Sequence, residues 1–138
     1  MTISEIENEI IEEFSMFDDW MEKYEHIIEL GKDLPIIDEA HKLEVNLIKG
    51  CQSRVWLNAE VKNGEISYTA DSDAIITKGI IALLVRVLNN QDAKEIVDAK
   101  LAFIDEIGLK EHLSPTRSNG LVSMIKQMKV YALLMQAS

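Results

Sequence analysis

Hydrophobic residues recur every three or four positions in the first third of the chain, which is the spacing of one face of an α-helix. They are Ile3, Ile6, Ile10, Ile11, Phe14 and Phe17, followed by Trp20, Tyr24, Ile27 and Ile28. Asp18-Asp19 separates the two groups, so we expect two helices. Gly31 suits the end of the second helix, and Leu34-Pro35 closes it because a residue before proline avoids the α region.

The middle of the chain has the features of short β-strands. We predict strands over residues 45–48, 54–61 and 66–70. An Asn63-Gly64 pair between the last two favours a two-residue type I′ hairpin. The expected result is a three-stranded antiparallel meander, with Cys51 in the connection between its first two strands.

Segment 74–88 is apolar on nearly every side, which predicts a buried helix. Asp71, Ser72 and Asp73 each offer an N-cap for it. Beyond it we expect short helices over 93–99 and 102–107, then a loop or helix start over 114–120. A final amphipathic helix carries Leu121, Ile125, Met128, Ala132 and Met135.

Together these elements predict an α+β fold, in which a three-stranded antiparallel sheet packs against helices. No repeat, low-complexity tract or linker interrupts the 138 residues. A chain of this length supports a hydrophobic core of its own. We therefore expect a single domain over residues 1–138.

Charge narrows the range of partners. The chain has 14 Lys and Arg against 24 Asp and Glu, a formal net charge of −10. This argues against nucleic-acid binding, because phosphate contacts need clustered Lys and Arg. Ten of the acidic residues fall within residues 1–30, where Lys23 is the single basic residue. Two interpretations stay open for this region: a solvated helical face, or a docking surface for a basic partner.

The sequence predicts a cytoplasmic protein without a membrane segment. Its N-terminus has no basic stretch followed by an apolar one. The most apolar window, 74–88, is interrupted by Thr77, Lys78 and Arg86 and is too short to cross a bilayer. One cysteine allows neither an internal disulfide nor a zinc site with paired thiolates, so we expect a free thiol.

Cys51 is the residue best suited to chemistry. A lone cysteine usually behaves as a small buried hydrophobe, but Cys51 falls at a predicted turn, next to Gly50. Lys49 and Arg54 are close in sequence, and we expect their charge to favour the thiolate. Lowering the thiol pKa by one unit from about 8.5 would ionise roughly a quarter of it at pH 7. Such a thiolate can attack a sulfane sulfur by the displacement that drives thiol–disulfide exchange.

Hydrolytic chemistry has less support. A cysteine hydrolase needs a histidine within hydrogen-bond reach of the sulfur, and an oxyanion site. The sequence assigns none of its three histidines to Cys51; they are His26, His41 and His112. We interpret His41, the nearest in sequence, as an exposed loop residue, and Trp56 as a core residue.

Residues 46–56, Asn-Leu-Ile-Lys-Gly-Cys-Gln-Ser-Arg-Val-Trp, resemble the signature of the SufE family, whose members accept sulfur from cysteine desulfurases. Segments 20–35, 71–82 and 112–121 resemble the same family, in the same order. Arg54 stands where Gln is frequent in the family, a departure that bears on partner preference more than on chemistry.

The resemblance implies a SufE/IscU-like fold and a mechanism. A pyridoxal-phosphate-dependent cysteine desulfurase of the SufS or CsdA type would hold sulfur as a persulfide. The chain would stimulate this enzyme, take the terminal sulfur onto Cys51 and pass it to a Suf-type iron–sulfur cluster scaffold. The chain itself would need no cofactor or metal and would have no independent turnover.

The resemblance also implies a supporting set of residues around Cys51: Gly50, Gln52, Ser53, Asp71, Ser72, Asp73 and Arg117. Arg117 would hold the loop or stabilise the sulfur anion. The plainer alternative stays open, in which Asp73 caps the buried helix and Arg117 pairs with a carboxylate.

Two other functions stay open. Cluster-assembly scaffolds share a related fold, but they typically use three cysteines where this chain has one. The chain could also be an interaction module with an inert cysteine. The sequence leaves undetermined the particular desulfurase and acceptor, the oligomeric state, and the exposure and pKa of Cys51.

Overall fold

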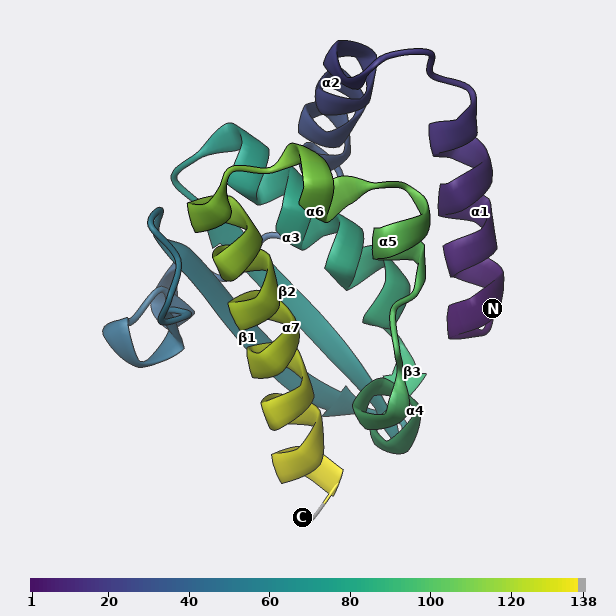
Figure 1. Ribbon diagram of the computed structural model, residues 1–138. Helices are drawn as coiled ribbons and strands as arrows, with labels where there is room; N and C mark the ends of the chain where they lie inside the picture. The colour runs from purple at the N-terminus through teal and green to yellow at the C-terminus, as the bar shows by residue number, and fades with distance from the viewer. Residues whose placement is uncertain (137–138) are drawn as a thin grey trace.

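Helices pack against one face of a small antiparallel sheet in the computed structural model, which describes residues 1–136 (Figure 1). In chain order the elements are α1 (Ile3–Ser15), α2 (Trp20–Gly31), the 3-10 turns η1 (Glu39–His41) and η2 (Glu44–Asn46), β1 (Val55–Lys62), β2 (Glu65–Ser72), α3 (Ile75–Leu88), β3 (Gln91–Asp92), α4 (Ala93–Asp98), α5 (Phe103–Glu106), α6 (Leu109–His112) and α7 (Pro115–Gln136). The predicted α+β class is confirmed. The last two residues of the predicted 1–138 domain lie outside the described residues.

The two N-terminal helices begin where their caps dictate. Thr2 and Glu5 form a capping box at α1, and the Asp19 carboxylate accepts the Glu22 amide at the start of α2 at 2.9 Å. The predicted break at Asp18-Asp19 is therefore confirmed.

α2 ends at Gly31, as predicted, and Lys32 occupies the C-cap position. Gly31 also has a role that the sequence pattern did not indicate. Gly31 lies where α2 crosses α3. A Cβ built on it would come 3.2 Å from the Gly79 amide nitrogen, and a Cβ on Gly79 would come 2.2 Å from the Ile27 carbonyl oxygen. The two glycines thus let the helix backbones touch.

The predicted hairpin is confirmed. β1 and β2 pair antiparallel from Val55–Ser72 to Lys62–Glu65. Asn63 and Gly64 have φ angles of 53° and 81°, as a type I′ turn requires. Alternate β2 residues, including Tyr68, are buried on one face of the sheet, against which α3 and α7 pack.

The predicted strand over 45–48 is wrong. A 3-10 turn occupies Glu44–Asn46, and Val45 is 81% exposed. Within this segment, Leu47 forms one isolated antiparallel β-bridge, to Trp56 of β1. The third strand is instead β3, whose two residues pair with the start of β2. A four-residue apolar run is too short for its periodicity to separate a strand from a turn. Cys51 therefore precedes β1 and does not connect two full strands.

α3 is the central buried helix, as predicted, with eleven of its fourteen residues buried. Its expected side-chain cap is absent: Ala74 occupies the N-cap position. The candidates Ser72 and Asp73 bond the backbone of Arg54. These side chains secure the loop after Cys51, which leaves the helix start without a side-chain cap.

α7 begins at Pro115, so the segment over 114–120 is mainly helical. The Ser114 hydroxyl accepts the Arg117 amide at 3.3 Å, and proline suits the first helical position. α7 runs across the sheet (Figure 1), where the Tyr68 hydroxyl donates to the Met128 carbonyl at 2.7 Å. This arrangement brings the N-terminal end of α7 to Cys51.

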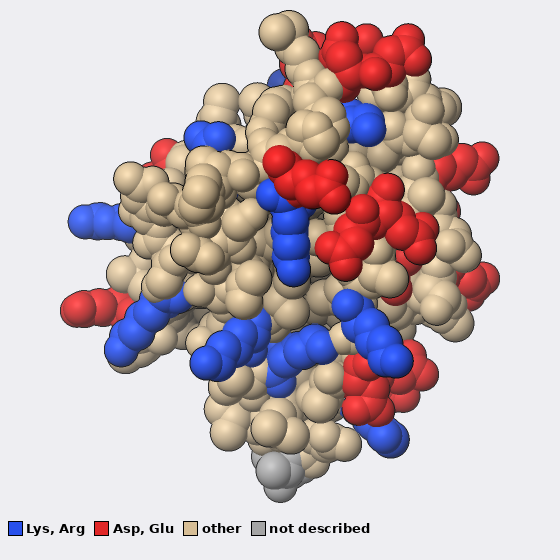
Figure 2. All heavy atoms as spheres, in the orientation of Figure 1, with Lys and Arg blue, Asp and Glu red and all other residues tan. Residues whose placement is uncertain are grey.

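Charge is unevenly distributed over the surface. Figure 2 shows acidic side chains at the top and right, over α2 and α1, and basic ones gathered lower down. Part of the acidic N-terminus is structural: Glu13 binds Arg86 of α3, which holds the pKa of Glu13 below its ordinary value, and Glu7 accepts the Phe103 amide. Within residues 1–136, none of the helices combines the length and apolar content needed to cross a membrane.

Candidate functional site

The segment around Cys51 is a short loop tied to the sheet at both ends. The Ile48 amide donates to the Val55 carbonyl at 2.8 Å. At the other end, the Arg54 amide donates to Asp73 at 3.0 Å, and Ser72 donates to the Arg54 carbonyl at 2.8 Å. Residues 49–53 form the tip of the loop between these bonds.

Gly50 allows this loop to lie against α7. Its φ of 94° is in the left-handed region that side chains disfavour. A Cβ at this position would also come 2.4 Å from the Ser123 hydroxyl of α7. Both backbone conformation and space therefore require glycine before the cysteine.

Cys51 is half-buried at the edge of a small cavity. Its thiol donates to the Gly120 carbonyl of α7, with a sulfur–oxygen distance of 3.6 Å. The cavity has a volume of about 80 Å³ and is lined by Cys51, Gln52, Ser53, Thr77, Ile80, Thr116, Arg117, Gly120 and Met124. A Cβ on Gly120 would lie 3.5 Å from Sγ, so this glycine keeps the space beside the sulfur open.

Burial raises the pKa of the Cys51 thiol. The expectation that Lys49 and Arg54 favour the thiolate is therefore wrong for this conformation. Both side chains are exposed, where solvent screens their charge, and desolvation dominates at the sulfur. The hydrogen bond to Gly120 agrees, since only a protonated thiol can donate it.

The structure brings some of the predicted site residues together. Gln52, Ser53 and Arg117 line the cavity with Cys51. Across residues 1–136 no carboxylate forms an ion pair with Arg117, and the alternative of such a pair is not found. The guanidinium is exposed beside the cavity.

The other predicted residues lie outside the cavity. Ser72 and Asp73 hold the loop through hydrogen bonds to the Arg54 backbone and do not reach the cavity. The alternative that Asp73 caps α3 is wrong. Asp71 binds Lys42 and Lys78 at 2.7 and 3.3 Å. Burial acts to raise the pKa of Asp71, but the bonds from Lys42 and from the Ser72 amide hold it below its ordinary value.

Five residues of α3 and α7 that line the cavity were not identified from the sequence. Thr77 and Ile80 come from α3, and Thr116, Gly120 and Met124 come from α7. One available signal was Thr77, a polar residue that is buried within a mainly apolar helix. Gly120 stood at the end of a segment already noted for its resemblance.

No histidine lines the Cys51 cavity. His26 bonds Glu13 at 3.2 Å, His112 stacks on Trp20 at 4.0 Å, and His41 is exposed as predicted. Trp56 is only partly buried, with the Lys42 ammonium 5.4 Å from its ring centre. Among residues 1–136 there is no group of His, Cys, Asp and Glu suited to holding a metal ion. The geometry therefore offers a single sulfur nucleophile without a general base.

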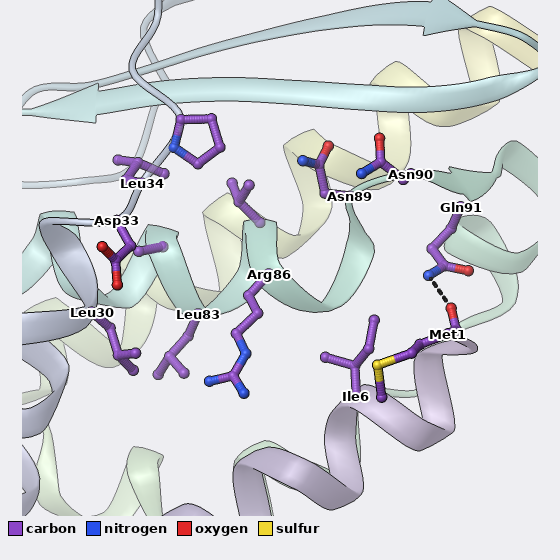
Figure 3. A pocket seen from close by; sticks show the side chains of 13 residues that line it. Met1, Ile6, Leu30, Asp33, Leu34, Leu83, Arg86, Asn89, Asn90 and Gln91 are labelled. Atoms are coloured by element: carbon purple, nitrogen blue, oxygen red, sulfur yellow. Dashed lines mark hydrogen bonds between the residues drawn. The ribbon is translucent and has the colours of Figure 1, made fainter.

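A larger cavity of about 450 Å³ lies between α1, α3 and the segment after α2 (Figure 3). Three of its polar side chains already have partners. Gln91 donates to the Met1 carbonyl at 2.9 Å, Asn89 accepts the Tyr68 amide at 2.7 Å, and Arg86 binds Glu13. It contains no nucleophile, so Cys51 marks the candidate site despite the smaller volume of its cavity.

Comparison with known proteins shows the family of this chain. Residues 8–132 match the family model "SufE: Fe-S metabolism associated domain". The chain is 38% identical over 128 residues to an uncharacterized SufE-like protein of Rhizobium meliloti, covering 88% of this chain and 91% of that one. It is 36% identical over 127 residues to one of Synechocystis, covering 92% and 80%.

Two further similarities extend the comparison. SufE-like protein 1 of Arabidopsis thaliana, described as chloroplastic/mitochondrial, is 39% identical over 128 residues, which cover 91% of this chain and 34% of the longer plant protein. The solution structure of a hypothetical protein from Thermus thermophilus superposes with a TM-score of 0.80 over 96% of this chain and 97% of that one. At 18% identity, that similarity concerns the fold.

Proposed function

Since this chain belongs to the SufE family, and so has a role in Fe–S metabolism, we propose that it is a sulfur carrier whose Cys51 accepts persulfide sulfur from a cysteine desulfurase. The proposed donor is a pyridoxal-phosphate-dependent enzyme of the SufS or CsdA type, which the carrier stimulates by removing its sulfur. The proposed acceptor is a Suf-type cluster scaffold.

The transfer is a thiol–persulfide exchange. The Cys51 thiolate attacks the terminal sulfur of the donor's persulfide, and a new sulfur–sulfur bond forms as the donor's own breaks. The donor cysteine leaves as a thiolate, and the terminal sulfur keeps its proton. A thiolate on the acceptor then repeats the displacement and regenerates Cys51, so no outside oxidant or reductant is needed.

The observation that carries this proposal is the position of Sγ beside a small cavity edged by Arg117, which has no ion pair within residues 1–136. A cavity needs roughly 15 Å³ to hold one water molecule. A cavity of about 80 Å³ therefore has room for one added sulfur atom. The Arg117 guanidinium supplies positive charge for a persulfide anion.

The protonated resting state suits a carrier that reacts only with its partner. Oxidants attack the thiolate, so a half-buried thiol bonded to Gly120 is protected between transfers. Movement of residues 49–53 away from α7 would break that bond and bring the sulfur beside Lys49, Arg54 and the donor.

The cytoplasm is the proposed location, because a single free thiol suits a reducing compartment. The plant relative is named for organelles, but that name describes the longer plant protein. A cluster-scaffold function is less well supported, since the chain has one cysteine and no metal-holding group among residues 1–136.

Desulfurase turnover tests the proposal. We expect the wild-type chain to raise the rate at which a Suf-type desulfurase forms alanine from cysteine, and Cys51→Ser to leave the rate of the enzyme alone. In the matched control, Ser15→Cys is added to Cys51→Ser, which places a thiol at the exposed end of α1. Restored stimulation by this control, or full stimulation by Cys51→Ser, would contradict the proposal.

A further inference from the structure

A shallow apolar groove runs between α4 and α7, on another side of α7 from Cys51. Its volume is about 510 Å³, and its apolar lining consists of Val97, Val122, Ile125, Val130 and Leu133. We call it the α4–α7 groove. Gly120 and Met124 line the Cys51 cavity instead, so a ligand in the groove leaves that cavity accessible.

The groove exists because α7 is apolar on two faces. One face, with Leu121, Met124, Met128 and Ala132, is buried in the core. On the groove face Val122 is 51% exposed, Val130 37% and Leu133 55%. A surface helix ordinarily needs one apolar stripe, and a second exposed stripe is characteristic of an interaction site.

Lysines frame the groove: Lys100, Lys110, Lys126 and Lys129. None of them forms an ion pair within residues 1–136, although acidic residues far outnumber basic ones. The Lys129 ammonium donates to the Ala99 carbonyl, and the other three side chains have no hydrogen bond within the same residues that would hold them away from a ligand. Figure 2 shows basic side chains gathered across the lower half of the face on which α7 and α4 lie.

The Lys and Arg residues that form no ion pair within residues 1–136 are unevenly distributed over the surface. Six of the fourteen Lys and Arg residues pair with acids: Lys32, Lys42, Lys62, Lys78, Arg86 and Lys94. Of the eight that form no ion pair within residues 1–136, Lys23 lies over the Trp20 ring, Arg117 lines the Cys51 cavity and four frame the groove. The other two, Lys49 and Arg54, are exposed near Cys51 in sequence. The groove is thus a second place where the chain presents uncompensated positive charge, here around apolar surface.

We propose that the α4–α7 groove binds an acidic amphipathic helix of a partner protein. The apolar side of such a helix, spaced i, i+3, i+4 and i+7, would fill the groove, and its flanking Glu and Asp residues would meet the lysines. A second copy of this chain fits less well, because the apolar face of its acidic α1 is already buried at Ile10 and Phe14. The proposal does not depend on sulfur transfer at Cys51.

Fluorescence anisotropy with three labelled synthetic peptides tests this. One is a Leu/Glu amphipathic helix, the second has Lys in place of each Glu, and the third scrambles the first so that no apolar face forms. We expect the first to bind the wild-type chain with a Kd at least about ten-fold lower than the others, and to bind more weakly as salt is added.

Variants locate the binding. Lys100→Glu with Lys126→Glu should raise that Kd at least about ten-fold, and Leu133→Ser should raise it several-fold. The matched control, Lys32→Glu with Lys62→Glu, makes the same change in net charge at exposed sites outside the groove and should change Kd by less than about two-fold.

Three outcomes would overturn the proposal. They are equal affinity for the three peptides, absence of saturable binding by the acidic helix, and equal loss of binding in the control and the groove variants. Sedimentation adds a fourth: a wild-type dimer that Leu133→Ser dissociates would show that a second copy occupies the groove.

Discussion

At the scale of single residues, the surroundings of Cys51 explain how the thiol is sheltered and bear on its proposed use. The sulfur is half-buried, bonded to the Gly120 carbonyl and beside a cavity that admits one more atom of its size. An ordinary thiol is about 3% ionised at pH 7, and burial lowers that fraction further. Reactivity must therefore depend on movement of the loop or on the partner.

The pH dependence of alkylation tests this state. Because burial raises the pKa of Cys51, we expect iodoacetamide to label the folded chain more slowly at pH 7 than the urea-unfolded chain. The midpoint of the rate profile should lie above the usual value of about 8.5. By linkage, the buried thiol stabilises the fold below pH about 8.5, and this contribution is lost as pH rises through the folded pKa. A midpoint below about 8.5 would instead support a resting thiolate.

Gly50 provides a second test at this scale. Gly50→Ala combines a positive φ with a contact to Ser123, whereas Gly64→Ala has a positive φ with nothing within 4 Å of the new Cβ. We expect Gly64→Ala to lower the free energy of unfolding by about 1 kcal/mol, and Gly50→Ala by roughly 2–3 kcal/mol. Urea unfolding measures both. Adding Ser123→Ala should recover part of the loss at Gly50, and equal losses in the two single variants would contradict the proposed contact.

At the scale of elements, α2 packs against α3, the helix that supplies Thr77 and Ile80 to the Cys51 cavity. A glycine inside a helix is usually improved by alanine, by about 1 kcal/mol. Gly79→Ala should do the opposite and destabilise the fold by about 2–3 kcal/mol, because its Cβ would meet the Ile27 carbonyl at 2.2 Å.

Gly120→Ala is the matched control for thermal unfolding. It also lies inside a helix, but its Cβ would make an ordinary 3.5 Å contact. We expect its effect on stability to be small or favourable. Stabilisation by Gly79→Ala would mean that the two helix backbones are not in contact.

Elements with a long periodic pattern or a specific turn were predictable from the sequence. α1, α2, α3 and the Asn63-Gly64 hairpin were found in this way. The four-residue run at 45–48 was not, because its pattern fits a strand and a turn equally. Ser114-Pro115 suits both a loop and a helix start, and the hydrogen bonds from the Arg117 and Ser118 amides to Ser114 decide between them.

The candidate site was predictable as far as it is local. Gly50, Cys51, Gln52 and Ser53 lie in one short motif, and Arg117 came from a second segment. The walls from α3 and α7 were missed because these helices meet only in three dimensions. From the sequence we also expected a lowered pKa for Cys51, whereas burial raises it. The charged residues near Cys51 can be read from the sequence, but its burial depends on tertiary packing.

At the scale of the whole molecule, acidic and basic side chains occupy different parts of the surface. Acidic side chains gather over α1 and α2 (Figure 2), where Glu7 and Glu13 also hold neighbouring elements in place. Cations without an ion pair among residues 1–136 include Arg117 at the Cys51 cavity and the four lysines of the α4–α7 groove. The partner helix proposed for the groove would therefore meet a basic surface, although the net charge of the chain is −10.

The central claim, that Cys51 accepts sulfur, is tested most directly by intact-mass spectrometry. The chain is incubated with a Suf-type cysteine desulfurase, pyridoxal phosphate and cysteine, and is then weighed. We predict a gain of one or more sulfur atoms that maps to the peptide containing Cys51, is removed by dithiothreitol and is absent from Cys51→Ser. An unchanged mass of the wild-type chain, while the desulfurase itself carries a persulfide, would contradict the account.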